Sequence, residues 1–132
     1  MSGFTFTWKG SDLIKQVRDN VEEALHGAAV DAAKAASDNA AVDTGFLRGS
    51  TYAKSKRGST GMTQGVDTRM WSPKQKRMVR RRSVAAPPLG DATAMFGSSA
   101  IYAIFVEVKT KPFLYPAAAT LPDAIKARLK AL

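Results

Sequence analysis

One long run of helical periodicity, from Ser11 to about Ala40, most constrains what this chain can fold into. Its apolar residues recur at three- and four-residue steps and so share one face of a helix: Leu13, Ile14, Val17, Val21, Leu25, Ala28, Ala32 and Ala35. At about 1.5 Å per residue the helix is about 45 Å long, which is long for so small a domain. Past Gly27 the apolar face consists of alanine, which predicts close packing against a sheet or a neighbouring subunit.

The remaining chain contains shorter elements that complete a mixed fold. We expect strands at 46–56, 62–69 and 99–108, a turn at 57–61, an extended linker at 111–116, and a final helix from Ala117 or Leu121 to Leu132. The segment 99–108 has apolar residues on both faces, which favours a central strand. We therefore predict an α+β fold, with the long N-terminal helix packed on a small antiparallel sheet, an inserted basic arm and a short C-terminal helix. The length fits a single domain, 1–132, with 70–95 as the inserted basic loop or arm.

Positive charge is concentrated in one segment. Between Lys54 and Arg82 the chain has ten bases and one acid, Asp67, so this segment carries the whole net charge of +9 while the rest is neutral. Residues 71–88 contain three prolines and are too polar for a core, so we expect an irregular arm. Its bases are the candidate contacts to DNA or to an acidic protein: Lys74, Lys76, Arg77, Arg80, Arg81 and Arg82. A solvated loop that only confers solubility is the alternative.

The residues for catalysis or cofactor binding are sparse. The chain has no cysteine and a single histidine, His26, one turn after Glu22 and Glu23 on the long helix, where a charged helix surface is the simplest interpretation. No apolar run approaches the roughly 20 residues of a membrane span. We therefore expect no enzyme, cofactor, metal site or small-molecule substrate, and no membrane association.

Asp43, Thr44 and Gly45 form a triplet that also occurs at the active site of aspartic proteases. In those enzymes an apolar strand precedes the triplet, whereas an alanine-rich helix precedes it here and Phe46-Leu47-Arg48 follows. A structural turn between helix and strand is the simpler interpretation, because Asp and Thr side chains form hydrogen bonds to nearby backbone groups and Gly tolerates positive φ.

Two segments together resemble a known family. The first is Val42-Asp43-Thr44-Gly45-Phe46-Leu47-Arg48-Gly49-Ser50; the second runs from Ile101 to Glu107 and continues as Lys111-Pro112-Phe113-Leu114-Tyr115-Pro116-Ala117. In this order, after a long helix, they resemble the neck or tail-completion proteins, which join head to tail in long-tailed bacteriophages. The insertion of Val108-Lys109-Thr110 after the acid departs from the family pattern, and the basic arm has no counterpart in it.

The resemblance implies a structural virion protein, made in the bacterial host cytoplasm, that forms a ring at the head–tail junction. We expect a homo-oligomeric ring, a hexamer first and a dodecamer as the alternative, in contact with neighbouring connector and tail proteins and, through the basic arm, with packaged DNA. Glu107 and the cluster Phe113, Leu114 and Tyr115 are candidate subunit-interface residues. That cluster fits a core equally well. The alternative function is that of a basic nucleic-acid-binding protein, which the charge block favours.

Overall fold

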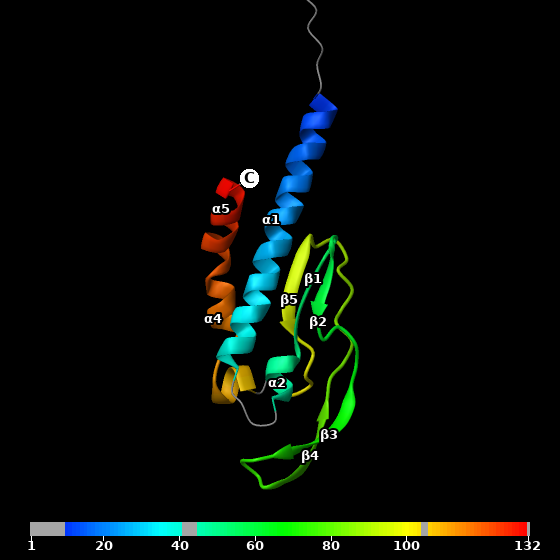
Figure 1. The fold of residues 1–132 in the computed structure, drawn as a ribbon, viewed down its shortest axis with the longest axis vertical. Helices are drawn as coiled ribbons and strands as arrows, with labels where there is room; N and C mark the ends of the chain where they lie inside the picture. The colour runs from blue at the N-terminus through cyan, green and yellow to red at the C-terminus, as the bar shows by residue number, and fades with distance from the viewer. Residues whose placement is uncertain (1–9, 41–44, 104–105, 132) are drawn as a thin grey trace, which may run out of the picture.

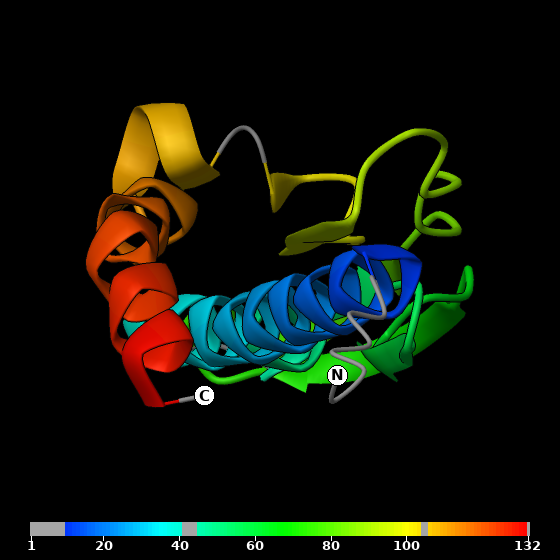
Figure 2. The ribbon, with the colours of Figure 1, turned by 90° about the horizontal axis from the view of Figure 1, so that it is seen from above.

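A computed structural model describes residues 10–40, 45–103 and 106–131. The long helix α1 (Gly10–Asn39) runs along the longest axis of the molecule (Figure 1). A small sheet lies along one side of it and two C-terminal helices lie along the other, an arrangement that is also visible when the molecule is seen from above (Figure 2). The predicted α+β fold, with its long N-terminal helix, antiparallel strands and short C-terminal helix, is confirmed.

The main sheet has three antiparallel strands in the order β2-β1-β5, so β1 (Thr51–Ser55) lies at its centre. β2 (Gly58–Gly61) returns through a tight turn, and β5 (Ala94–Ser98) pairs with the other edge of β1. The Ser55 hydroxyl stabilises the turn, because it accepts a hydrogen bond from the backbone N–H of Arg57 at 3.1 Å. The second strand of this hairpin begins earlier in the chain than we predicted, because the expected turn at 57–61 is mostly strand β2.

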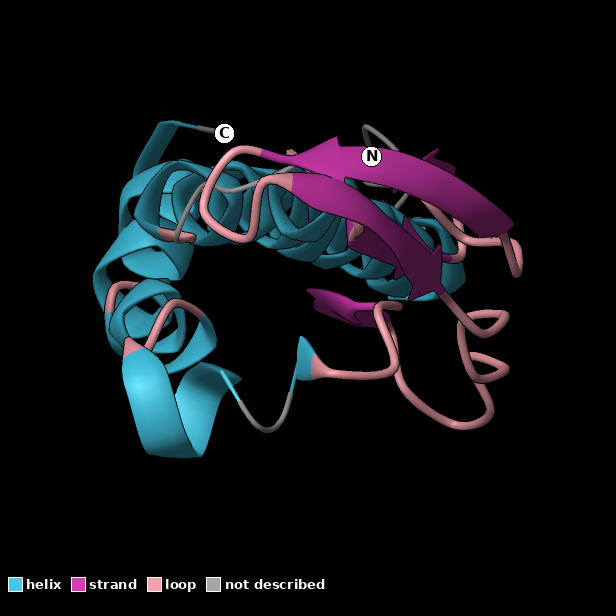
Figure 3. Cartoon of the chain, turned by 90° about the horizontal axis from the view of Figure 1, so that it is seen from below, coloured by secondary structure: helices cyan, strands magenta, loops and turns pink. Residues whose placement is uncertain are grey.

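A second, two-stranded antiparallel sheet is formed by β3 (Asp67–Ser72) and β4 (Arg77–Arg82). This hairpin extends from the end of the molecule opposite the start of α1 (Figure 1), and Figure 3 shows it from below. Ser83 ties its base to the body: its hydroxyl accepts the N–H of Val66 at 2.8 Å, and Ser83 forms an isolated bridge with Ala100. The expected irregular arm at 71–88 is therefore wrong for its first two thirds, 71–82, which belong to a regular β-ribbon.

Short helices complete the fold. α2 (Phe46–Gly49) precedes β1, the π-helical turn η1 (Val106–Thr110) follows the sheet, and α4 (Leu114–Ala119) leads into α5 (Leu121–Ala131). The predicted C-terminal helix is confirmed as α5, whereas the expected linker at 111–116 already contains the start of α4. Among the described residues, no helix is both long and apolar enough to cross a membrane.

The core is built on the alanine face of α1. Ala29 and Ala33 pack with Ala53 of the central strand, which confirms the predicted close packing against a sheet. Larger side chains fill the core at the C-terminal end of α1, where the cluster consists of Ala36, Ala40, Phe46, Leu47, Ala100, Ala103, Phe113 and Ala117. His26 lies at the same helix–sheet contact, with its Nδ1 2.5 Å from the Ser55 hydroxyl. It is half-buried and does not belong to a surface charge pattern as expected.

The segment from Ser99 to Val108, expected to be the central strand, is not a strand in its described part. Strand pairing ends at Ser98, opposite Thr51. Tyr102 and Ala103 then pack with the core, whereas Ile101 is exposed. Tyr102 stacks on Phe46 with ring centroids 6.3 Å apart. β-Propensity depends strongly on neighbours, and in the described part of this segment the pairing is limited to an isolated bridge between Ala100 and Ser83.

Gly45 precedes α2 with φ of 82°, in the left-handed region that only glycine adopts easily. Phe46 and Leu47 then turn into the core, so the expected strand at 46–56 begins only at Thr51. Of the predicted turn residues, Asp43 and Thr44 lie outside the described residues. The structural role predicted for Gly45 agrees with its backbone conformation.

We predict that Gly45→Ala lowers the free energy of unfolding by about 1 to 2 kcal/mol, because a Cβ is unfavourable at positive φ. Gly49→Ala is the matched control: an added Cβ meets nothing within 4 Å at either position, and only Gly45 has positive φ. Urea denaturation of both variants measures the difference. Equal stability of the two variants would contradict the conformational argument.

Candidate polyanion interface

The hairpin β3–β4 has two unlike faces, because cross-strand partners project to the same side of an antiparallel pair. One face presents three exposed pairs to solvent, namely Asp67 with Arg82, Arg69 with Arg80, and Trp71 with Met78. Trp71 and Met78 are about half exposed, at 56% and 50%. This face therefore combines cations with an aromatic and a flexible apolar side chain.

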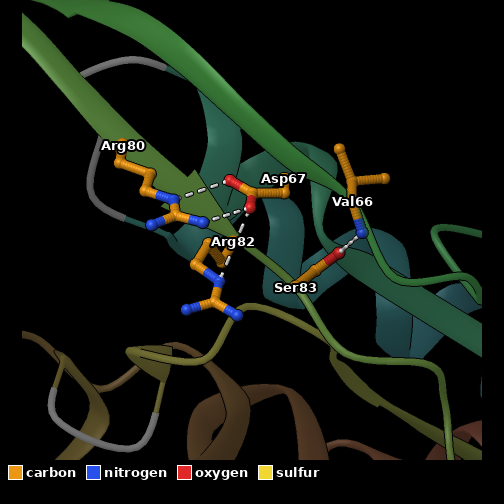
Figure 4. A network of polar contacts seen from close by, with 5 residues as sticks. All are labelled: Val66, Asp67, Arg80, Arg82 and Ser83. Carbon is orange, nitrogen blue, oxygen red and sulfur yellow. Dashed lines mark hydrogen bonds and ion pairs between the residues drawn. The ribbon is translucent and has the colours of Figure 1, made fainter.

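Asp67 organises the base of the exposed face (Figure 4). Its carboxylate accepts two hydrogen bonds from Arg80, from Nε at 2.9 Å and from Nη2 at 2.5 Å, and the Nε of Arg82 lies 3.9 Å away. The hydrogen bond from Arg80 holds the pKa of Asp67 below its usual range. The only acid of the basic segment thus engages two of the six predicted contact residues, Arg80 and Arg82, both at the base of the hairpin.

The tip of the hairpin carries the remaining predicted contacts, Lys74, Lys76 and Arg77, all exposed. Buried Ser72 shapes this turn, since its carbonyl accepts the N–H of Lys76 at 2.7 Å and its hydroxyl accepts the N–H of Gln75 at 3.1 Å. Lys76 has φ of 53°, so the turn holds this lysine in a left-handed conformation. The ordered turn presents three cations at the most distant point of the hairpin from its base.

A polar hollow of about 350 Å³ lies on the hairpin itself. Four guanidinium-bearing residues line it, together with Gln75, Met78 and Val79: Arg69, Arg77, Arg80 and Arg81. Gln75 orients Arg77, because its side-chain oxygen accepts hydrogen bonds from Nε at 3.0 Å and Nη2 at 2.9 Å. Guanidinium groups bind phosphate and carboxylate oxygens with two parallel hydrogen bonds, so this arrangement suits a polyanion.

The opposite face of the hairpin belongs partly to the fold. Val79 is buried, and Arg81 lies over the ring of Tyr102 with its guanidinium carbon 5.1 Å from the ring centroid. The sequence treated the whole arm as lying outside the core, which is wrong for Ser72, Val79 and Arg81. Arg81 is thus a packing residue of the hairpin base as well as part of the basic surface.

Glu107, predicted as a subunit contact, is engaged within the chain. Its carboxylate accepts the backbone N–H groups of Phe113 at 2.7 Å, Leu114 at 2.9 Å and Tyr115 at 2.8 Å. These are the donors that the start of a helix leaves unpaired, so Glu107 caps α4 from six residues away. Desolvation raises the pKa of Glu107, but the three backbone donors outweigh it and hold that pKa below the ordinary value.

The apolar cluster predicted beside it separates into core and surface. Phe113 is completely buried in the main core cluster, Leu114 is partly buried against it, and Tyr115 is 75% exposed. Of the two alternatives left open by the sequence, core filling holds for Phe113 and a free surface for Tyr115.

Searches with this sequence and structure against family models, curated proteins and solved structures found no match. The resemblance to neck proteins consequently remains a prediction from the two sequence segments.

Replacing Glu107 by glutamine tests the cap. We expect Glu107→Gln to lower stability by about 1 to 2 kcal/mol at pH 7, because one acceptor oxygen and its charge are lost. Since the folded-state pKa is lowered, the carboxylate stabilises the fold above its unfolded pKa of about 4.3 and loses this effect as pH falls through the folded value. The gap between wild type and variant should therefore close at acid pH.

The matched control is Glu23→Gln, which removes an exposed carboxylate from α1. Thermal unfolding from pH 7 to pH 3 compares the three proteins. A difference between wild type and Glu107→Gln that stays constant over this range would rule out the carboxylate cap.

Proposed function

We propose that this protein is a structural component of a tailed-phage virion, forming a ring at the head–tail junction and using the hairpin β3–β4 to contact the DNA that passes through it. The observation that carries the proposal is the placement of charge: the ordered ribbon β3–β4 contains seven bases and one acid, so it carries +6 of the net charge of +9, and it extends from the body of the molecule. The resemblance of two sequence segments to neck proteins supports the choice of the head–tail junction.

A ring multiplies the charge of the hairpin. Closed homo-oligomers repeat the same surface around an axis, so a hexamer, or alternatively a dodecamer, presents six or twelve copies of the tip cations. Like-charged tips repel one another unless a counter-charge lies between them. DNA on the ring axis supplies that counter-charge, as would an acidic surface on a neighbouring connector or tail protein.

The second candidate function, a free nucleic-acid-binding protein, is favoured by the exposed Trp71 beside Arg69 and Arg80. Aromatic side chains stack on bases and arginines bind phosphates, and a two-stranded ribbon fits the major groove of duplex DNA. The two functions differ in whether the isolated protein binds DNA by itself. A dedicated binder should hold random duplex DNA with micromolar or tighter affinity as an isolated protein, with a steep salt dependence. A neck protein requires its ring and its neighbours.

We predict that the triple variant Lys74→Gln, Lys76→Asn and Arg77→Gln folds normally but impairs head–tail joining or retention of packaged DNA in the phage that encodes it. Asparagine suits the positive φ at position 76. The substitutions leave Arg80 on Asp67 and Arg81 over Tyr102. If the three side chains contact phosphates, the salt-dependence slope for duplex DNA should decrease by about 2 to 3.

The control removes the same charge elsewhere, through Lys34→Gln, Lys126→Gln and Lys130→Gln, which are exposed on α1 and α5. Counts of infectious, DNA-filled particles and a salt titration of binding compare the variants. If the hairpin variant yields as many filled, infectious particles as the control, the hairpin has no role at the junction and only confers solubility.

A further inference from the structure

The molecule exposes two apolar surfaces at opposite ends. The first is a ridge at the start of α1, where large aliphatic side chains are exposed: Leu13 56%, Ile14 61%, Val17 53% and Val21 38%. Further along α1 the same helix face is buried as Ala24, Ala28 and Ala32. The first turns of α1 extend beyond the sheet and beyond α5, so no described element covers them (Figure 1).

The second surface is an apolar hollow of about 530 Å³ between the end of β5 and the start of α4. Its lining includes Val84, Ala100, Ile101, Ala103, Glu107 and Leu114. The Glu107 carboxylate is bonded to the start of α4, so the wall offers mostly hydrocarbon to a ligand. Val84 and Ile101 at its edge are 59% and 53% exposed.

The side chains of the ridge are spaced like those of a helix that binds in an apolar groove. Ile14, Val17 and Val21 follow one another at steps of three and four residues, which is the anchor spacing of helix-in-groove recognition. The hollow supplies the complementary shape, a concave apolar surface. It lies near the hairpin base, at the end of the molecule opposite the ridge, so one copy cannot fill its own hollow (Figure 1).

The charges around the two surfaces are also complementary. The segment of α1 from Asp12 to Glu23 contains four acids and two bases, so its net charge is negative. The segments that contain the lining of the hollow, 82–84, 98–103 and 106–114, include three bases, Arg82, Lys109 and Lys111, and one acid, Glu107, so their net charge is positive. Opposite net charges favour a ridge against a hollow over two ridges against each other.

We infer that the ridge at the start of α1 docks into the hollow of a second copy of this chain. The interface is heterologous, with one patch meeting a different patch, and such contacts build rings when the rotation between copies closes. The inference rests on the proposed ring and names its subunit contact, although the contact itself can be tested without phage.

Engineered cysteines test the contact, because the natural chain has none. Val17→Cys and Ile101→Cys each place a thiol on one of the two surfaces, at side chains exposed enough to tolerate it. Under mild oxidation of the purified protein, the double variant should give a ladder of dimers, trimers and larger covalent species. An equimolar mixture of the two single variants should stop at dimers that contain one copy of each.

Two controls define failure. Glu23→Cys with Ile101→Cys puts the helix thiol on the far side of α1, and its ladder should be lost. If Val17→Cys alone forms dimers and the mixture forms no more dimers than this variant does by itself, two ridges pair with each other and the proposal is wrong. The proposal is also wrong if the double variant does not cross-link. If the ladder forms but the hairpin variant produces normal phage, the subunit interface stands and the DNA contact is rejected. If the hairpin variant impairs the phage but no ladder forms, the DNA contact stands and the subunit interface is rejected.

Discussion

Close packing of the alanine face of α1 on the central strand is the contact on which the rest of the structure depends. The small side chains of Ala29, Ala33 and Ala53 let helix and strand backbones approach closely. Alanine buries little apolar area, so this contact alone stabilises the fold weakly. The larger burial comes at the C-terminal end of the helix, where Phe46 and Phe113 fill the core. At the start of the helix no described element covers the aliphatic side chains, and they are exposed.

Polar contacts between segments distant in sequence position the surfaces that surround this core. Glu107 pairs three backbone donors of α4 and thereby brings Phe113 into the core and leaves Tyr115 outside. Ser83 and Ala100 hold the hairpin base against the body. Both contacts adjoin the apolar hollow, so the same few hydrogen bonds shape a candidate subunit contact and orient the basic ribbon.

The basic ribbon illustrates how one acid organises many cations. Asp67 holds Arg80 and approaches Arg82 at the base, while the turn shaped by Ser72 carries the other cations outward. A flexible arm would pay the entropy of ordering when it binds, whereas an ordered ribbon has already lost that freedom. Pre-ordered cations beside an exposed tryptophan therefore suit repeated contact with a polyanion.

The sequence by itself determined the features that depend on local pattern: the long helix with its change to alanine, the glycine at the turn, the final helix and the location of the charge. Only the tertiary structure decided the path of residues 99–103, the ribbon at 67–82 and the fate of Glu107 and Phe113. Strand formation depends on whether a neighbouring strand is available to pair. In the described part of the segment after Ser98, strand pairing is limited to the isolated bridge between Ala100 and Ser83. The ribbon has too few apolar residues to show the alternation of apolar and polar residues that indicates a strand. The capping of α4 by Glu107, from six residues away, likewise leaves no periodic pattern in the sequence. Such contacts form between distant segments, so they appear only when the chain is folded.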